Sequence, residues 1–527
     1  MKRDWTSRTS LLLVGVILVL LNLIGVNLFL RLDLTDDNVY SLSPASIRLV
    51  ENLEDPVTFK AFFTPNLPAP YSSNLRFLRD KLDDYRAYGG RNVQYEFVDP
   101  GSDEALREEA ERYGIPPVQI QVIENDNLQI KNAFMGLAIL YGGEREIIPV
   151  VQDLSTLEYD ITSALKKLTR ERTPVVGFLT GHGEPTPAQH MPALDRALQR
   201  NYDVRTVSVT DTTLSPRPDV LLVVAPSDSL PEAHLKAIDA YLMSGGKAGF
   251  LLNRVAANLQ MGQASELTTG LEGLLERYGA RIGANLVMDR QSSSISVQRN
   301  LGGFIVQQAI EYPFFPIATR FNPDHQMVNR LREVGLYYAS ALDTAAVLPE
   351  NVTLEPLMYS SPRSGLQQDF FFIQPMVARS METLRDGPYV LAAAYSGTFP
   401  SAYVDGLRSP NTRLVVVGDG DFVNASLMGT EIPGNVAFVL NMVDWLAQDD
   451  DLLAIRTKTI EPRQLEFVSE AVRPWIKYAN MLGPALLVLL FGLIRWRLRK
   501  SRTFVLPGSP APSAPETPRR AEVHEPA

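Results

Sequence analysis

The chain has 527 residues, of which 45% are hydrophobic and 21% charged, so it is long enough for more than one domain and has the composition of a folded protein. Its net charge is −10, and because both ends are basic, the middle is more acidic still, which argues against nucleic acid and anionic lipid as partners. It contains no cysteine, which excludes disulfides, thiol nucleophiles, CxxC redox pairs and thiolate metal sites.

An uncharged apolar segment lies near each end of the sequence. Residues 11–30 are long enough for a helix that crosses the hydrocarbon core of a membrane, and residues 478–494 form a second, shorter segment that contains Pro484. Basic residues precede the first segment and follow the second, so the sequence predicts two transmembrane helices with both chain ends in the cytoplasm. The alternatives are a cleaved signal peptide for the first segment and a buried core helix for the second.

Strands and helices alternate after the first apolar segment. Ser43 and Pro44 have the pattern of an N-cap and a first helical residue, which predicts a helix over 44–53. The pattern of apolar residues then predicts strand, helix, strand, helix, strand and strand at 57–63, 72–88, 93–98, 103–113, 118–124 and 135–141. This β-α-β-α-β-β order is that of a thioredoxin-like module, which without cysteines is expected to be structural or to bind a partner.

A second module is predicted from residue 153 onward. A helix over 153–172 precedes a series of strands, which alternate with helices at 188–200 and 231–244, and the strand at 220–224 is almost uniformly apolar. These strands are predicted at 175–179, 204–209, 220–224, 248–252 and 413–417. Continuous apolar strands that alternate with helices predict a doubly wound parallel α/β sheet covered on both faces, and an apolar helix at 434–448 is expected to pack on it.

The predicted organisation has seven parts. They are a cytoplasmic N-terminus (1–10), a transmembrane helix (11–30), a thioredoxin-like extracytoplasmic module (31–152), an α/β module (153–455) with an irregular insertion (290–405), a juxtamembrane linker (456–477), a transmembrane helix (478–494), and a basic and then Pro-rich disordered cytoplasmic tail (495–527).

Two glycine-rich loops carry the candidate site residues. GHGE at 181–184 and GDGD at 418–421 each follow a predicted strand and are expected at the carboxyl edge of the sheet, where doubly wound folds bind ligands. His182 and Glu184 suit a base with its orienting carboxylate or a metal site, and Asp419 and Asp421 with one imidazole suit Mg²⁺ or Ca²⁺. Both patterns also describe tight turns, and we favour that structural or binding-loop interpretation over catalysis.

No nucleotide-binding or hydrolase motif is present. The sequence has no phosphate-binding loop, GxGxxG, GxSxG or HExxH, so any ATP must be hydrolysed by another chain, and no cofactor or metal is expected. The other histidines are expected to be solvated or structural: His190, His234, His325 and His524.

Several segments together resemble one known family. They are the basic N-terminal anchor, LTDDNVYSLSPAS, VVGFLTGHGE, the helix-closing GGK, VVVGDGDFVNA and the C-terminal anchor. This combination, over residues 5–497, resembles the auxiliary subunits of gliding-motility-type ABC transporters, the GldG-like family. The resemblance implies an extracytoplasmic domain related to class I glutamine amidotransferases but without the nucleophile, beside a separate ATP-binding subunit and permease, at the bacterial inner (cytoplasmic) membrane with the main domain periplasmic.

The sequence therefore favours a non-catalytic accessory of an ABC transport complex, with a ligand or partner at the edge formed by 180–187 and 418–424. One alternative is a metal-dependent hydrolase of cell-envelope glycans or peptides that uses His182, Asp419 and Asp421. The other is a scaffold that binds only proteins.

Overall fold

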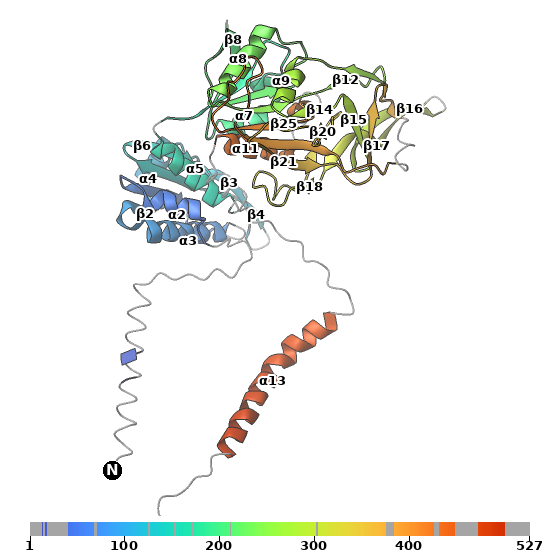
Figure 1. Ribbon diagram of the computed structural model, residues 1–527. Coiled ribbons are helices and arrows are strands. Elements are labelled where there is room, and N and C mark those ends of the chain that lie inside the picture. Colours follow the sequence, from blue (N-terminus) through green and yellow to red (C-terminus); the bar gives the residue numbers. More distant parts are fainter. Residues whose placement is uncertain are drawn as a thin grey trace, which may run out of the picture. The chain divides into compact units, whose positions relative to one another are not determined.

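The computed structural model describes residues 41–447 apart from short gaps, the helix 473–500, and residues 13, 16 and 17. The gaps are 68–70, 125–126, 152–153, 155, 171, 211, 302–303, 376–383 and 426–431. Residues 1–460 form one compact unit and residues 461–527 a second. The described part of the first unit is a mixed α/β structure with a smaller and a larger module (Figure 1).

A four-stranded sheet forms the smaller module. Its strand order is β2-β1-β5-β6, in which β1 and β2 are parallel and the other neighbours antiparallel. Its strands are β1 (Val57–Phe63), β2 (Val93–Val98), β5 (Met135–Tyr141) and β6 (Glu144–Ile148). Its helices are α2 (Pro44–Glu51), α3 (Ser72–Gly89), α4 (Glu104–Arg112) and α5 (Leu157–Thr169), with a 3-10 turn η1 (Gly90–Asn92) after α3. The predicted N-cap of α2 is confirmed, because the Ser43 side chain accepts a hydrogen bond from the Ser46 amide.

Two elements of this module differ from the sequence prediction. Strand β3 (Val118–Glu124) does not join the sheet but pairs with β4 (Asn127–Ala133) in a separate hairpin. Helix α5, predicted to open the second module, instead packs in the core of the first through Leu157, Ile161 and Leu165. The physical reason for the position of α5 is the spacing of these three residues. It places all of them on one helix face, which is buried against the smaller sheet.

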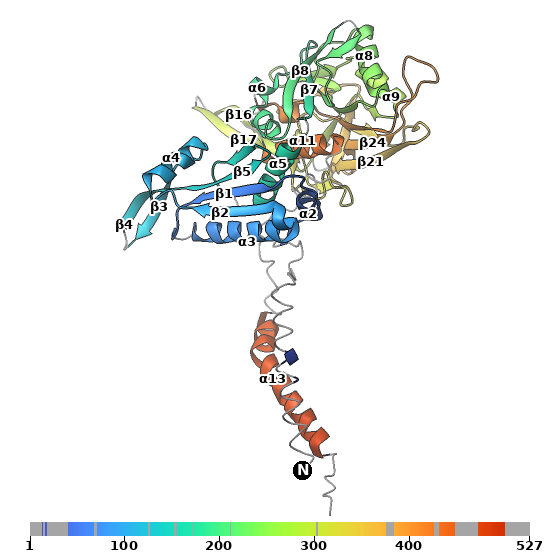
Figure 2. The ribbon, with the colours of Figure 1, turned by 90° about the vertical axis from the view of Figure 1, so that its left-hand side faces the viewer.

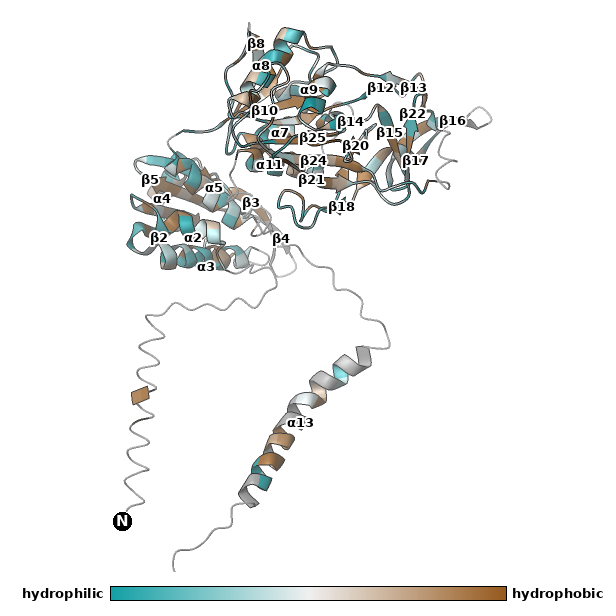
Figure 3. Ribbon diagram, in the orientation of Figure 1, coloured by the Kyte–Doolittle hydropathy of each residue, from teal (hydrophilic) through white to brown (hydrophobic). Residues whose placement is uncertain are grey.

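Five parallel strands form the centre of the larger module. In sheet order they are β25 (Thr412–Val417), β11 (Lys247–Leu251), β10 (Val220–Val224), β7 (Val175–Leu179) and β8 (Asp203–Thr210). The three strands β10, β11 and β25 are almost wholly buried, and Figure 3 shows this centre as predominantly hydrophobic. The predicted parallel, buried sheet is therefore present.

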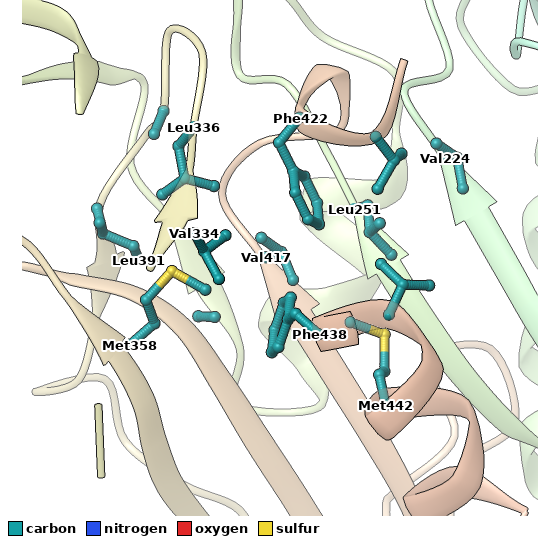
Figure 4. Packing of buried hydrophobic residues seen from close by; sticks show 14 of the residues in the cluster. Val224, Leu251, Val334, Leu336, Met358, Leu391, Val417, Phe422, Phe438 and Met442 are labelled. Carbon is teal, nitrogen blue, oxygen red and sulfur yellow. The ribbon is translucent and has the colours of Figure 1, made fainter. Parts of the chain in front are cut away.

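Helices cover both faces of this sheet. Along β10 the side chains of Val220, Leu222 and Val224 face one core cluster, together with α7 (Pro192–Leu198) and α11 (Pro433–Leu446). The residues between them, Leu221 and Val223, face a second core cluster, to which α8 (Glu232–Met243) and α9 (Leu271–Arg277) contribute. Figure 4 shows Phe438 and Met442 of α11 packed near Val417 and Leu251.

Segment 290–405 was expected to be irregular, but it contains several regular strands. Two of them, β24 (Val390–Gly397) and β21 (Val352–Tyr359), extend the main sheet in antiparallel fashion beyond β25. In the sequence, Pro356 suggests that no strand passes through this position. In the structure it lies at a register shift of β21, where a bulge accommodates it.

The remaining elements complete the larger module. They are α6 (Pro187–His190), β9 (Thr213–Ser215), β12 (Val255–Asn258), β13 (Gln263–Glu266), β14 (Arg281–Ile282), β15 (Asn285–Asp289), β16 (Ser292–Leu301), β17 (Phe304–Ala318), β18 (Arg320–Phe321), β19 (Val334–Gly335), β20 (Leu342–Asp343), β22 (Ser364–Gln368), β23 (Phe371–Phe372) and the 3-10 turn η3 (Asp421–Val423).

The second unit contains helix α13 (Arg473–Lys500), which includes the predicted crossing at 478–494. Among the residues that the structure describes, no helix is both long and apolar enough to cross a membrane, so this predicted crossing is not supported. Apart from residues 13, 16 and 17, the predicted crossing at 11–30 lies outside the described residues, as do 448–472 and 501–527.

Candidate functional site

The predicted loops lie at the carboxyl edge of the parallel sheet and border one cleft. The cleft has a volume of about 1100 Å³, and its lining includes Glu184 and Asp421. Strands β10 and β11 lie between β7 and β25, so at the usual strand spacing the two loops start roughly 14 Å apart. They therefore share the cleft, but their four candidate side chains do not converge on one point.

Loop 181–184 is a tight turn that holds itself together. Gly181 and Gly183 have φ angles of +115° and +80°, in the left-handed region that favours glycine. Between them His182 is buried, and its backbone N–H donates to Glu184 Oε2 over 2.7 Å. The His182 carbonyl accepts hydrogen bonds from the amides of Ser227 and Asp228, which ties this loop to the loop after β10.

A third titratable side chain completes this turn. His182 Nδ1 lies 3.0 Å from Glu184 Oε1, and its Nε2 lies 2.7 Å from Nδ1 of His234 on α8. With Glu184 ionised, His182 donates to it through Nδ1–H and accepts from His234 Nδ1–H. Both ring nitrogens of His182 are then occupied, which favours its structural interpretation. The sequence prediction treated His234 as isolated, although β7 and β10 are neighbours and α8 follows β10.

Loop 418–421 is held differently, by backbone amides. Asp419 is fully buried, and its two oxygens accept from the N–H groups of Tyr337 (2.6 Å) and Asp421 (2.7 Å). Asn253, just after β11, donates to Asp421 Oδ2 over 2.9 Å and accepts from the Gly420 amide. Asp419 is therefore a structural acceptor, whereas Asp421 lies on the cleft lining.

Burial shifts the acidity of this carboxyl pair. Burial raises the pKa of Asp421 to about 6, while the hydrogen bond from Asn253 lowers it. The pKa of Asp419 is raised well above its usual range, first by burial and then by the negative charge of Asp421. Asp421 thus changes its charge close to neutral pH, as carboxyl groups at binding and catalytic sites often do.

The geometry does not favour the metal-dependent hydrolase. Within the part of the chain that the structure describes, no group of three or more His, Asp or Glu side chains is placed to hold a metal ion. The hydrolase requires His182, Asp419 and Asp421 to converge, yet the ring nitrogens of His182 and both oxygens of Asp419 already have protein partners.

The cleft also contains residues that the sequence prediction missed. Aromatic side chains of Phe315, Tyr337 and Tyr338 line it, together with amides such as Asn253. Ala225 and Tyr338 line it with left-handed φ angles of +44° and +54°, which are unfavourable for residues with a side chain and cluster at functional sites. In the sequence, the aromatic pairs in YPFFP and LYYAS are the signal that could have indicated this aromatic lining.

Comparison with known proteins places this chain in a family. Residues 173–442, just over half of the chain, match a family described as an ABC-type uncharacterized transport system. The chain belongs to this family. Residues 36–140 separately match a domain of unknown function.

Two individual proteins are also similar to this chain. An uncharacterized protein of Borreliella burgdorferi is 21% identical over 492 residues, which cover 89% of this chain and 94% of that protein. The solved mmIFT52 N-terminal domain is 14% identical with a TM-score of 0.33, over 52% of this chain and 97% of that domain. That structural likeness is too low to support an argument.

Proposed function

We propose that the chain is a non-catalytic accessory subunit of an ABC-type transport complex, and that its cleft receives a ligand or a segment of a partner. The observation that carries this proposal is the family match at 173–442, because these residues supply the lining of the cleft. The family is one of transport systems, and this chain lacks the motifs of an ATPase. Energy for transport would therefore come from a separate ATP-binding subunit.

The chemistry of the cleft supports binding over catalysis. It offers the Asp421 carboxyl, the His190 imidazole, neutral amides and aromatic rings, which are groups that orient a ligand by hydrogen bonds and stacking. In loop 181–184 the polar groups of His182 and Glu184 bond to each other, and the ring of His182 also bonds to His234. The chain has no cysteine to serve as nucleophile.

The finer parts of the proposal depend on the sequence. They are membership of the gliding-motility-type (GldG-like) group, association with a permease, and attachment to the bacterial inner membrane through 11–30 and 478–494 with the main body periplasmic. The motifs quoted above and the basic flanks of both segments support them.

Co-purification tests the proposal. The full chain is co-expressed with a candidate permease and ATP-binding protein, beside the cleft variants Tyr338→Ala and Asp421→Ala and the control Asp405→Ala, which changes an exposed aspartate outside the cleft lining. We expect the wild type and the control to recover both partners, and the cleft variants to impair either recovery or transport. Failure of the wild type to recover them would contradict the accessory role. Full recovery and transport by every variant would instead favour the scaffold.

A further inference from the structure

Within the described residues, strand β8 has an edge without a partner strand along five of its eight residues. On one side it pairs with β7 throughout Asp203–Val207, and on the other β9 pairs only with Ser208–Thr210. Pro216 follows β9 and has no N–H to extend that pairing. No strand of the described chain pairs with the outer side of 203–207, and both views show β8 at the outside of the larger module (Figures 1 and 2).

The direction of the free backbone groups follows from the hydrogen bonds to β7. The Asp203 N–H donates to the Pro174 carbonyl, and the Val207 carbonyl accepts from the Thr180 amide. These odd-numbered residues therefore face β7. Because successive residues of a strand direct their backbone groups to opposite sides, Val204 and Thr206 direct their N–H and C=O groups toward the open edge.

A groove runs beside these groups. It has a volume of about 570 Å³ and lies between the edge of β8 and the helices α6 and α7. Its lining comprises Thr186, Pro187, Ala188, Asp195, Gln199, Val204, Arg205, Thr206 and Pro216. Val204 and Thr206, whose backbone groups point outward, thus line this groove.

We infer that this groove is a strand-addition site, in which an extended segment of another protein lies beside β8 and exchanges backbone hydrogen bonds with Val204 and Thr206. Alternating N–H and C=O groups at a sheet edge are complementary to another extended backbone. Over 203–207 the edge has no lysine, proline or bulge, and the charges of Asp203 and Arg205 neutralise each other in an ion pair of 2.6 Å.

The negative net charge of the chain indicates what kind of segment binds at the edge of β8. At a net charge of −10, two copies of this chain repel each other, so a segment of a different protein, neutral or basic, fits the edge better than a second copy. The side chains of such a segment that face α6 meet Pro187 and Ala188, which suits small or β-branched residues. This site is separate from the cleft lining and does not depend on the proposed function.

Hydrogen exchange of single amides tests the inference. The full chain, labelled with ¹⁵N-valine and ¹⁵N-threonine, is examined by NMR alone and with the peptide Lys-Val-Thr-Val-Thr-Val-Lys at about 1 mM, because addition to one short edge is weak. We expect the amides of Val204 and Thr206 to exchange quickly in the chain alone and to slow at least about tenfold with peptide. The Val207 amide should be slow in both.

Two variants at one position provide the matched controls. Thr206→Pro removes an outward-facing donor but none of the N–H groups that bond to β7, so the variant should fold and lose the peptide effect at Val204. Thr206→Ala keeps the backbone N–H and should retain it. An N-methylated peptide, which lacks backbone donors, should have no effect.

Three results would overturn the inference. The first is no slowing with peptide in the wild type. The second is slow exchange of Val204 and Thr206 in the isolated monomer, which would mean that a segment of this same chain occupies the edge. The third is slowing that appears only as the chain concentration rises, which would assign the edge to a second copy.

Discussion

The two glycine-rich loops at the carboxyl edge have the same pattern but are held together in different ways. In loop 181–184 the polar side chains bind each other and His234, whereas in loop 418–421 Asp419 binds backbone amides and Asp421 remains on the cleft. In both loops the residue between the glycines is buried. A glycine-rich loop after a strand therefore predicts where a site lies, while the tertiary partners decide which of its side chains faces a ligand.

The largest expected effect is on Asp419. Asp419→Ala removes the acceptor of two buried N–H groups, those of Tyr337 and Asp421, so we expect a loss of roughly 2 to 5 kcal/mol in the free energy of unfolding. Urea unfolding of the full chain measures it, with the exposed Asp405→Ala as control. A loss no larger than that of the control would show that Asp419 does not hold this loop.

The next effect is a pH dependence at Asp421. Its pKa is raised from 3.8 to about 6, so the folded state holds its proton more tightly than the unfolded state, and stability falls as the pH rises from about 4 to about 6. Asp421→Asn cannot ionise and should gain roughly 1 to 3 kcal/mol relative to wild type over this range. Thermal unfolding at a series of pH values measures the difference, and parallel curves would contradict the prediction.

Glu184→Gln should have a smaller effect. Glutamine has one acceptor oxygen where the carboxylate offers two, so either the His182 amide or its Nδ1–H loses its partner. We expect a loss of about 1 to 2 kcal/mol, measured by urea unfolding at neutral pH. An unchanged midpoint would show that the turn is maintained by its glycines alone.

The smallest effect is the coupling between the two imidazoles. A double-mutant cycle with His182→Ala and His234→Ala should give an interaction energy of about 0.5 to 1 kcal/mol, because one hydrogen bond of 2.7 Å joins the rings. Additive losses would mean that the contact contributes nothing to stability.

The sequence predicted the centre of the fold well and the site only in outline. Strands β7, β10, β11 and β25 lie within one residue of their predicted ranges, because a fully buried parallel strand reads as a continuous apolar run. The contact of His182 with His234 and the aromatic lining of the cleft depend on which strands are neighbours, which local patterns do not encode. Strand β21 in segment 290–405 is hard to recognise in the sequence because Pro356 lies at a register shift within it.

The rate of ATP hydrolysis tests whether the cleft serves an ABC-type complex. It is measured on a purified complex of this chain with the permease and ATP-binding subunit proposed above. We predict that Tyr338→Ala and Asp421→Ala change that rate or the affinity of this chain for the complex by about tenfold or more, as for residues at the centre of an interface, while Asp405→Ala leaves both unchanged. The same rate and affinity for all four proteins would show that the cleft does not serve the complex.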